Sequence, residues 1–180
     1  MLVAKQVADL MTFCRLLMSV FLVWLGLVDG KSGLPFAGWT MLLSWTSDAL
    51  DGPIARRSKV KYNSWLGDHD LQVDMAVCAG LLGYFMLSNY LSPQLGILYL
   101  FIWGLIFWRW GIQRSPGMLF QAAPFAFLIY LSLRYSLPEG IALITWIIGV
   151  IILTWPRFPQ EVVPGFLHGM RFKLKHKKSH

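Results

Sequence analysis

The chain has 180 residues, of which 56% are hydrophobic and only 14% are charged. A soluble domain usually carries about 25% charged residues, so this composition excludes an ordinary water-facing fold and indicates a protein whose solvent is the bilayer. The formal net charge is +7, and basic residues are concentrated in the polar segments and in the C-terminal tail. Since a spanning helix takes roughly 20 residues, the length allows about six spans and no soluble domain, and we expect one domain over residues 1–180.

Apolar stretches recur along the chain, separated by polar segments that mostly contain glycine or proline, as turns do. No alternating strand pattern is present, so we expect an all-α, polytopic membrane protein with six transmembrane helices. A short amphipathic segment precedes the first apolar stretch, and no signal-peptide cleavage site follows it. The predicted spans cover residues 10–28, 34–50, 69–89, 94–113, 118–133 and 138–155.

The distribution of basic residues predicts the orientation of the chain. With six spans, most of the 16 Lys and Arg residues fall on one side of the membrane, whereas Lys31 and Arg134 fall on the other and Arg15 lies within the first span. The positive-inside rule then predicts cytoplasmic N- and C-termini in an integral, multi-pass protein, which we expect in a bacterial inner membrane. The basic tail, residues 156–180, is expected to attract anionic lipid headgroups rather than nucleic acid.

The stretch "DALDGPIAR" places two carboxylates on the second predicted helix. Because a helix turns by about 100° per residue, Asp48 and Asp51 share a face. The same stripe continues through Gly52, Ala55 and Arg56, and its small residues would leave room for a ligand beside the acids. An ionised acid within a membrane is costly, so this stripe is a candidate functional site.

The third predicted helix carries a second acidic pair. Asp70 and Asp74 are four residues apart and share a face, and Gly67 lies three residues before Asp70. The connecting loop is short enough for the two helices to be antiparallel neighbours whose acids face each other. Four like charges repel one another unless cations join them, and Mg²⁺, Mn²⁺ and Ca²⁺ prefer oxygen ligands. The pattern therefore predicts a site for one or two divalent ions that could bind a diphosphate.

Two alternatives to this metal site remain open at this point. Intramembrane acids also occur in divalent-cation transporters, although the broken helices and repeated halves of transporters are not evident in this sequence. The acids could instead form a salt-bridge cluster with the basic residues that follow the second span, which are Arg56, Arg57, Lys59 and Lys61.

The pattern D-x-x-D-G-x-x-A-R, followed by D-x-x-x-D, resembles the signature of the CDP-alcohol phosphotransferases, a family of integral membrane enzymes. The first half matches without deviation, and Asp70 and Asp74 match the closing pair. The spacer differs from the family pattern, so that His69 occupies the position that strict spacing would give to the third acid. The intact spacing of Asp70 and Asp74 favours Asp70 as the third acid, and His69 as a metal ligand is the alternative.

A second resemblance lies near the N-terminus, where "DLMTFCR" is similar to the N-x-x-T-x-x-R segment of many family members. Thr12 and Arg15 match this segment, and Asp9 stands where asparagine is common. The three residues are spaced three apart and form one helical stripe. We expect Arg15 to interact with the acids or with a phosphate, and the alternative is that its side chain snorkels to the membrane interface.

The resemblance implies an enzyme that transfers a phosphatidyl group from a CDP-linked lipid, such as CDP-diacylglycerol, to an alcohol and releases CMP. It implies Mg²⁺ or Mn²⁺ bound by the acids of the signature, a polar cavity open to the cytoplasm, and a homodimer. Asp74 would also act as the general base. The implied metal ligands are Asp48, Asp51, Asp70 and Asp74, and the implied nucleotide or phosphate contacts are Gly52, Ala55, Arg56, Gly67, Thr12 and Arg15.

The identity of the alcohol is open. Basic residues after the fourth span hold the acceptor's phosphate in relatives that use a phosphorylated alcohol, and Arg109 and Arg114 are the candidates here. A phosphatidylglycerolphosphate synthase-like enzyme is one possibility among several acceptors. The altered spacer also leaves open an inactive member of the family.

Overall fold

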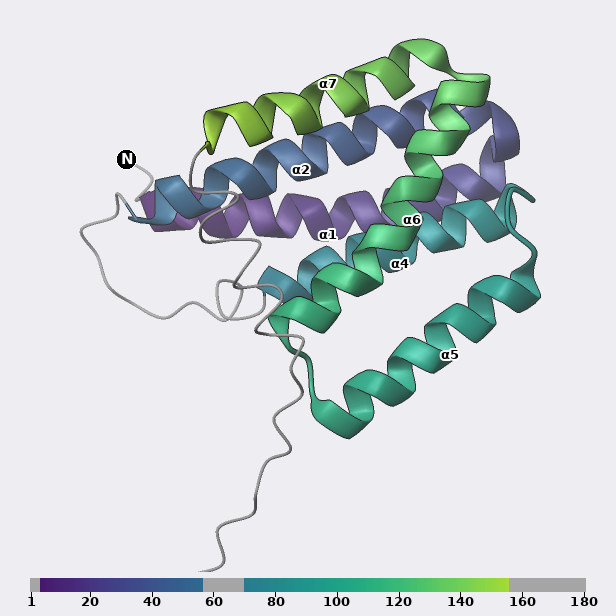
Figure 1. Ribbon diagram of the computed structural model, residues 1–180, viewed down its shortest axis with the longest axis horizontal. Helices are drawn as coiled ribbons and strands as arrows, with labels where there is room; N and C mark the ends of the chain where they lie inside the picture. The colour runs from purple at the N-terminus through teal and green to yellow at the C-terminus, as the bar shows by residue number, and fades with distance from the viewer. Residues whose placement is uncertain (1–3, 57–69, 156–180) are drawn as a thin grey trace, which may run out of the picture.

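The computed structural model describes residues 4–56 and 70–155, except the side chains of residues 4, 5, 8 and 51–56. Within these ranges the chain consists of helices and short connections, with no strand (Figure 1). A short 3₁₀ helix, η1 (Gly30–Gly33), joins the first two α-helices. The six α-helices are α1 (Ala4–Val28), α2 (Leu34–Arg56), α4 (Asp70–Leu87), α5 (Pro93–Trp110), α6 (Arg114–Tyr135) and α7 (Leu137–Leu153).

The prediction of an all-α protein is confirmed, and each α-helix overlaps one of the six predicted spans. Two boundaries differ. The separate N-terminal segment is part of α1, which is continuous from Ala4, and α2 continues to Arg56 instead of ending at residue 50. Three helical segments are long and apolar enough to cross a membrane, whereas α7 is apolar but shorter, so six spans remain a prediction. The three segments are Asp9–Val28, Asp70–Leu87 and Arg114–Tyr135.

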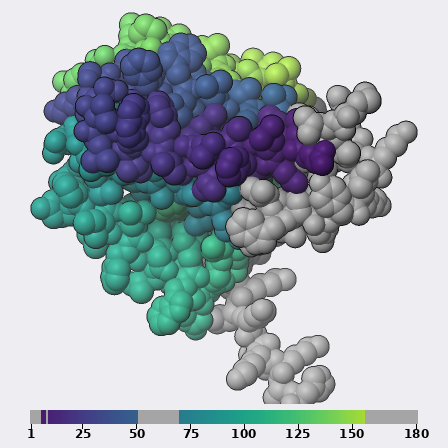
Figure 2. Space-filling view, turned by 180° about the vertical axis from the view of Figure 1, so that it is seen from behind, coloured from purple at the N-terminus to yellow at the C-terminus, as the bar shows by residue number. Residues whose placement is uncertain are grey.

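The helices run back and forth, so that the end of α2 and the start of α4 lie at the same end of the bundle (Figure 1). Helix α1 packs mainly against α4 and α2, and α6 packs against α7 and α4. Seen from behind, α1 crosses the face of the molecule between α2 and the teal helices (Figure 2). This central position of α1 brings its polar stripe next to the acidic residues of both neighbours.

Glycine allows α1 and α4 to approach closely. A Cβ atom added at Gly80 would collide with the backbone of Ser19 on α1. A Cβ added at Gly26 would lie 3.1 Å from the Cα of Tyr84 on α4. Small residues at helix contacts let backbones approach each other within membranes, where no hydrophobic effect drives helices together. These contacts fix how α1 is placed along α4.

We expect Gly80→Ala to destabilise the protein, because the obstructing atoms are backbone and cannot rotate away. Overpacking of this kind costs about 1–3 kcal/mol. The measurement is the midpoint of thermal unfolding in detergent, which should fall in Gly80→Ala. Gly104→Ala is the matched control, since a Cβ at Gly104 meets nothing within 4 Å. Equal midpoints for the two variants would contradict the close packing of α1 and α4.

A proline interrupts α6, and a tyrosine of α5 compensates for it. Pro124 lacks an N–H, so the carbonyl of Phe120 loses its normal helical donor. The Tyr99 hydroxyl donates to this carbonyl at 2.6 Å. Irregular helices persist in membranes only where another group satisfies the released backbone atoms. This hydrogen bond therefore holds α5 to the middle of α6.

Removal of the hydroxyl in Tyr99→Phe should lower stability by about 1 kcal/mol, since the Phe120 carbonyl then keeps only the weak thiol donor of Cys78, 3.9 Å away. Thermal unfolding checks this change. The double variant Tyr99→Phe/Pro124→Ala restores an N–H for the carbonyl and should recover most of the loss. If Pro124→Ala gives no recovery in the Tyr99→Phe background, the proposed compensation is wrong.

Candidate active site

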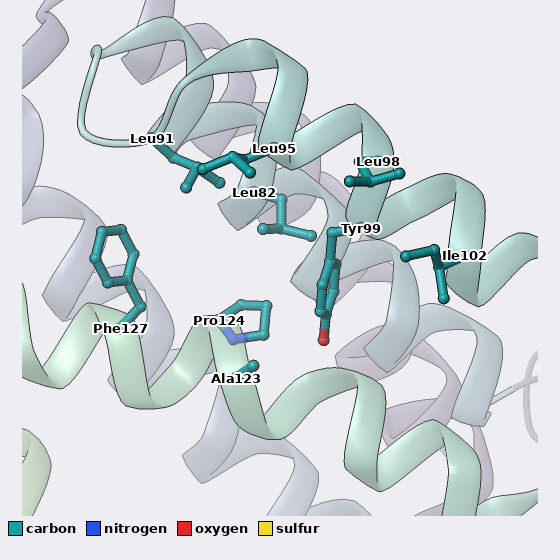
Figure 3. Close-up of a pocket in the computed structure, with 9 residues that line it drawn as sticks. All are labelled: Leu82, Leu91, Leu95, Leu98, Tyr99, Ile102, Ala123, Pro124 and Phe127. Carbon is teal, nitrogen blue, oxygen red and sulfur yellow. The ribbon is translucent and has the colours of Figure 1, made fainter.

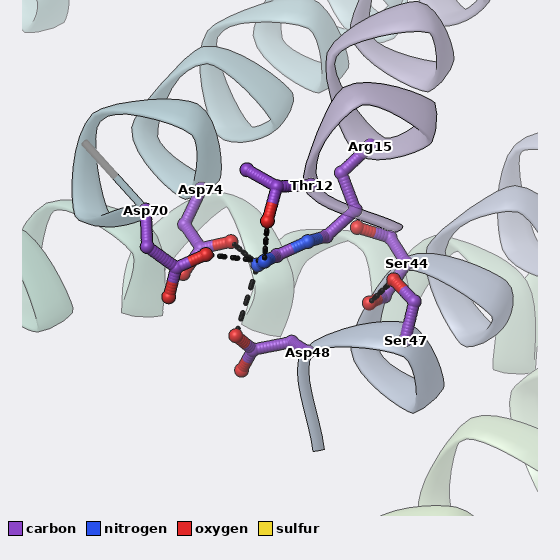
Figure 4. Close-up of polar contacts among 7 residues, drawn as sticks. All are labelled: Thr12, Arg15, Ser44, Ser47, Asp48, Asp70 and Asp74. Carbon is purple, nitrogen blue, oxygen red and sulfur yellow. Dashed lines mark hydrogen bonds and ion pairs between the residues drawn. The ribbon is translucent and has the colours of Figure 1, made fainter. Parts of the chain in front are cut away.

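Arg15 is the centre of the polar cluster in Figure 4. Its side chain is fully buried and extends from α1 toward α2 and α4. The guanidinium donates to Asp48 of α2 at 2.9 Å and to Asp70 and Asp74 of α4. It also donates to Thr12, one turn earlier on α1, at 3.3 Å. One arginine thus connects α1, α2 and α4 at this end of the bundle.

The three aspartates are close enough to share an ion. One carboxylate oxygen from each lies within 4.8 Å of the others. Asp74 is the least exposed of the three, with 22% of its side chain accessible, compared with 41% for Asp70 and 50% for Asp48. The cluster is therefore closed on the α1 side and open toward solvent beside Asp48.

The charge of the cluster favours a divalent cation. When all three carboxylates are ionised, they and the Arg15 guanidinium together carry two negative charges, and a partly buried site holds such an excess only at a cost. Carboxylate oxygens are the ligands that Mg²⁺ and Mn²⁺ prefer. Asp48, Asp70 and Asp74 thus fit a hard divalent ion in both charge and donor type.

The structure brings together five residues of the predicted site, which are Thr12, Arg15, Asp48, Asp70 and Asp74. For Arg15 the alternative of a snorkelling side chain is wrong, because the acids bind the guanidinium inside the bundle. The backbone of Asp51, Gly52, Ala55 and Arg56 belongs to the last turns of α2, but their side chains lie outside the description. Gly67, His69 and the loop residues Arg57, Lys59 and Lys61 lie outside the described residues altogether.

The two candidate acceptor-binding residues differ in position. Arg114 begins α6 and lies close enough to Asp48 to contribute to its electrostatic surroundings. Arg109 lies in the last turn of α5, with its guanidinium 5.8 Å from the ring centre of Trp110. Next to Arg114, a Cβ atom at Gly117 would lie 3.1 Å from Leu71, so the start of α6 packs against the start of α4. Arg114 is therefore nearer to the acidic cluster along the packed surface.

A comparison with models of protein families assigns the chain to one family. The family model for CDP-alcohol phosphatidyltransferase matches residues 5–158, which include all the helices around the cluster. The chain belongs to the CDP-alcohol phosphatidyltransferase family. Searches of curated proteins and of solved structures found no significant match.

Membership of the family carries general consequences for the chain. CDP-alcohol phosphatidyltransferases are membrane enzymes that transfer a phosphate-containing group from a CDP-alcohol and depend on a divalent metal. The apolar helices of the described structure agree with a membrane location. The predicted resemblance is thereby confirmed at the level of the family.

Proposed function

We propose that the protein transfers a phosphatidyl group from CDP-diacylglycerol or a related CDP-linked lipid to an alcohol and releases CMP. The observation that carries this proposal is the convergence of Asp48, Asp70 and Asp74 on Arg15. These acids come from two helices and are all members of the family signature, and the family match covers them. A cluster of this kind suits the binding of a diphosphate through a divalent ion.

We assign the acids of the signature as the ligands of Mg²⁺ or Mn²⁺, with Asp51 completing the set named by the motif. When bound, one or two such ions would neutralise charge on the diphosphate and on the departing CMP. Arg15 removes part of the repulsion among the acids and fixes their orientation through its planar set of donors. It therefore acts on the reaction as a positioning residue.

The chemical step needs a base for the attacking hydroxyl. In the proposed reaction the acceptor oxygen forms a bond to the phosphorus of the phosphatidyl group, and the bond from that phosphorus to the CMP oxygen breaks. The hydroxyl proton passes to Asp74, the most sheltered carboxylate of the cluster. A general base must lie within hydrogen-bond reach of the proton that it removes, and its partly enclosed position limits competition from water.

The remaining signature residues complete the proposed substrate site. Gly52, Ala55 and Gly67 would leave space for cytidine, whereas Arg56 and Thr12 would contact phosphate. Arg114, with Arg109 further away, would bind a phosphorylated acceptor, as in a phosphatidylglycerolphosphate synthase. We place this end of the bundle on the cytoplasmic side of the membrane and propose a homodimer.

The test is release of CMP by the purified full-length chain. CDP-diacylglycerol and Mn²⁺ are supplied with a panel of acceptors that includes glycerol 3-phosphate, inositol phosphate, serine and glycerol. We expect CMP release with one acceptor, complete loss in a chelator, and recovery when Mg²⁺ or Mn²⁺ is restored. CDP-lipid binding without turnover for every acceptor would indicate an inactive member of the family. Metal uptake into vesicles without CMP release would instead indicate a transporter.

A further inference from the structure

An apolar groove lies between α4, α5 and α6 (Figure 3). Its volume is about 360 Å³. Leu82 of its lining lies twelve residues after Asp70 on α4, about 18 Å along the helix axis, so the groove occupies the half of the bundle away from the acids. The residues that line it are Leu82, Leu91, Leu95, Leu98, Tyr99, Ile102, Ala123, Pro124 and Phe127.

Cations and tyrosines gather at the same end of the bundle. The Lys31 ammonium lies 5.7 Å from the ring centre of Tyr90, and the Arg134 guanidinium lies 5.7 Å from that of Tyr135. The rings of Tyr90 and Tyr135 are themselves 5.9 Å apart. We call these four residues the tyrosine cluster. It joins the α1–α2 connection, the α4–α5 connection and the end of α6 into one surface.

Residues of the groove are neighbours of the tyrosine cluster. Leu91, in the groove, follows Tyr90 directly in the chain. On α6, Phe127 of the groove stacks on Tyr130 with ring centres 6.3 Å apart, and Tyr130 is one turn before Arg134. The groove is therefore a near neighbour of the tyrosine cluster, whose two cations are exposed.

Both cations are unusual in their position. They are the basic residues that the topology prediction places on the side opposite to most of the others, where the positive-inside rule disfavours them. Among the described residues, no carboxylate lies within ion-pair distance of Lys31 or Arg134. Their charges are therefore available to an anion that arrives from outside the chain.

We propose that the groove and the tyrosine cluster together bind one anionic phospholipid, in the membrane leaflet opposite to Asp48, Asp70 and Asp74. The headgroup lies on the tyrosine cluster, where the charges of Lys31 and Arg134 attract its phosphate, and one acyl chain lies in the groove. Water is a poor occupant, because it needs polar partners and the lining is hydrocarbon. The positive charge of the tyrosine cluster matches the anionic headgroup of such a lipid, and the apolar groove matches its acyl chain. This site is separate from the proposed active site and does not depend on its function.

The experiment measures which lipids remain on the protein. The full-length chain is reconstituted in bilayers of equal amounts of phosphatidylglycerol and phosphatidylcholine with identical acyl chains, then extracted in mild detergent and analysed by native mass spectrometry. We expect the wild type to retain phosphatidylglycerol in preference. In Lys31→Gln/Arg134→Gln this preference should fall by about fivefold for each charge removed. The matched control, Lys31→Arg/Arg134→Lys, keeps both charges and should retain the preference.

Two groove-filling variants test the position of the acyl chain. Ala123→Phe and Leu98→Trp place bulk in the groove from α6 and α5 and should reduce retention of phosphatidylglycerol. Thermal unfolding identifies any variant that fails to fold, and the other variant then decides the result. The proposal is overturned if the glutamine variant keeps the wild-type preference or if neither filler lowers retention. A filler that changes the oligomeric state but not the retained lipid would assign the groove to a second copy and would also overturn it.

Discussion

Asp74→Asn should reduce CMP release by about 10²–10⁴-fold, the range expected for the loss of a general base. Asparagine keeps the size of the side chain but cannot accept the proton of the acceptor hydroxyl. Because Asp74 is the least exposed of the three acids, bulk water should replace it poorly. The measurement is the rate of CMP release under saturating CDP-diacylglycerol, Mn²⁺ and acceptor.

Two further variants separate the loss of a base from the loss of a metal ligand. In Asp48→Asn, a ligand on the open side of the cluster is weakened, so raising the Mn²⁺ concentration should recover part of the activity. No such recovery is expected in Asp74→Asn. Asp29→Asn, which changes a carboxylate at the other end of the bundle, should behave as the wild type. Full recovery of Asp74→Asn by Mn²⁺ would show that Asp74 is a ligand and not the base.

Substitution of Arg15 should affect both folding and activity. In Arg15→Ala, three carboxylates face one another without the guanidinium that connects them. Removing one partner of a fully buried ion pair costs about 3–5 kcal/mol, and the partial exposure of the acids reduces the expected cost here to about 2 kcal/mol. Thermal unfolding without added metal measures this loss. A divalent ion should stabilise Arg15→Ala more than the wild type, because the three acids have then lost the guanidinium that lies between them and only Arg114, near Asp48, still contributes positive charge.

Arg15→Lys separates charge from geometry. Lysine restores one positive charge, but its compact ammonium lacks the planar donors that contact three acids at once. We therefore expect most of the stability to return, while CMP release remains at least about tenfold below the wild type because the acids are misplaced. Wild-type activity in Arg15→Lys would show that the site needs only the charge. An Arg15→Ala variant as stable as the wild type would contradict the counter-ion role.

Local spacing predicted much of the fold and the site. The six helices followed from apolar segments separated by turn residues, and all six are present in the described chain. The four-residue spacing of Asp70 and Asp74 placed both on one face of α4, where they bind the same guanidinium. The three-residue spacing of Thr12 and Arg15 likewise gave the contact between them on α1. Such features depend only on the spacing of residues along one helix, so they can be predicted from a single sequence.

Contacts between helices were harder to predict from the sequence. The sequence left Arg15 with several possible partners, because Asp48, Asp70 and Asp74 are distant in the chain and their approach depends on how α1 packs against α4. That packing relies on backbone contact at Gly80. A glycine within an apolar stretch does not indicate which helix will pack against it. The tyrosine cluster was also missed. In the sequence, Lys31 and Arg134 stand out only as exceptions to the charge bias, whereas in the structure each is close to a tyrosine of the same surface.

The connection of three helices through Arg15 has a consequence for biogenesis. Membrane proteins are made from the N-terminus, so α1 reaches the translocon before Asp48, Asp70 and Asp74 have been synthesised. An arginine in a span weakens insertion by up to about 2.5–3.5 kcal/mol. The arrival of α2 and α4 supplies the carboxylates that offset this cost. We therefore expect full insertion of α1 to depend on the emergence of α4, because a nascent chain that stops before Asp70 lacks two of the three acids that bind Arg15.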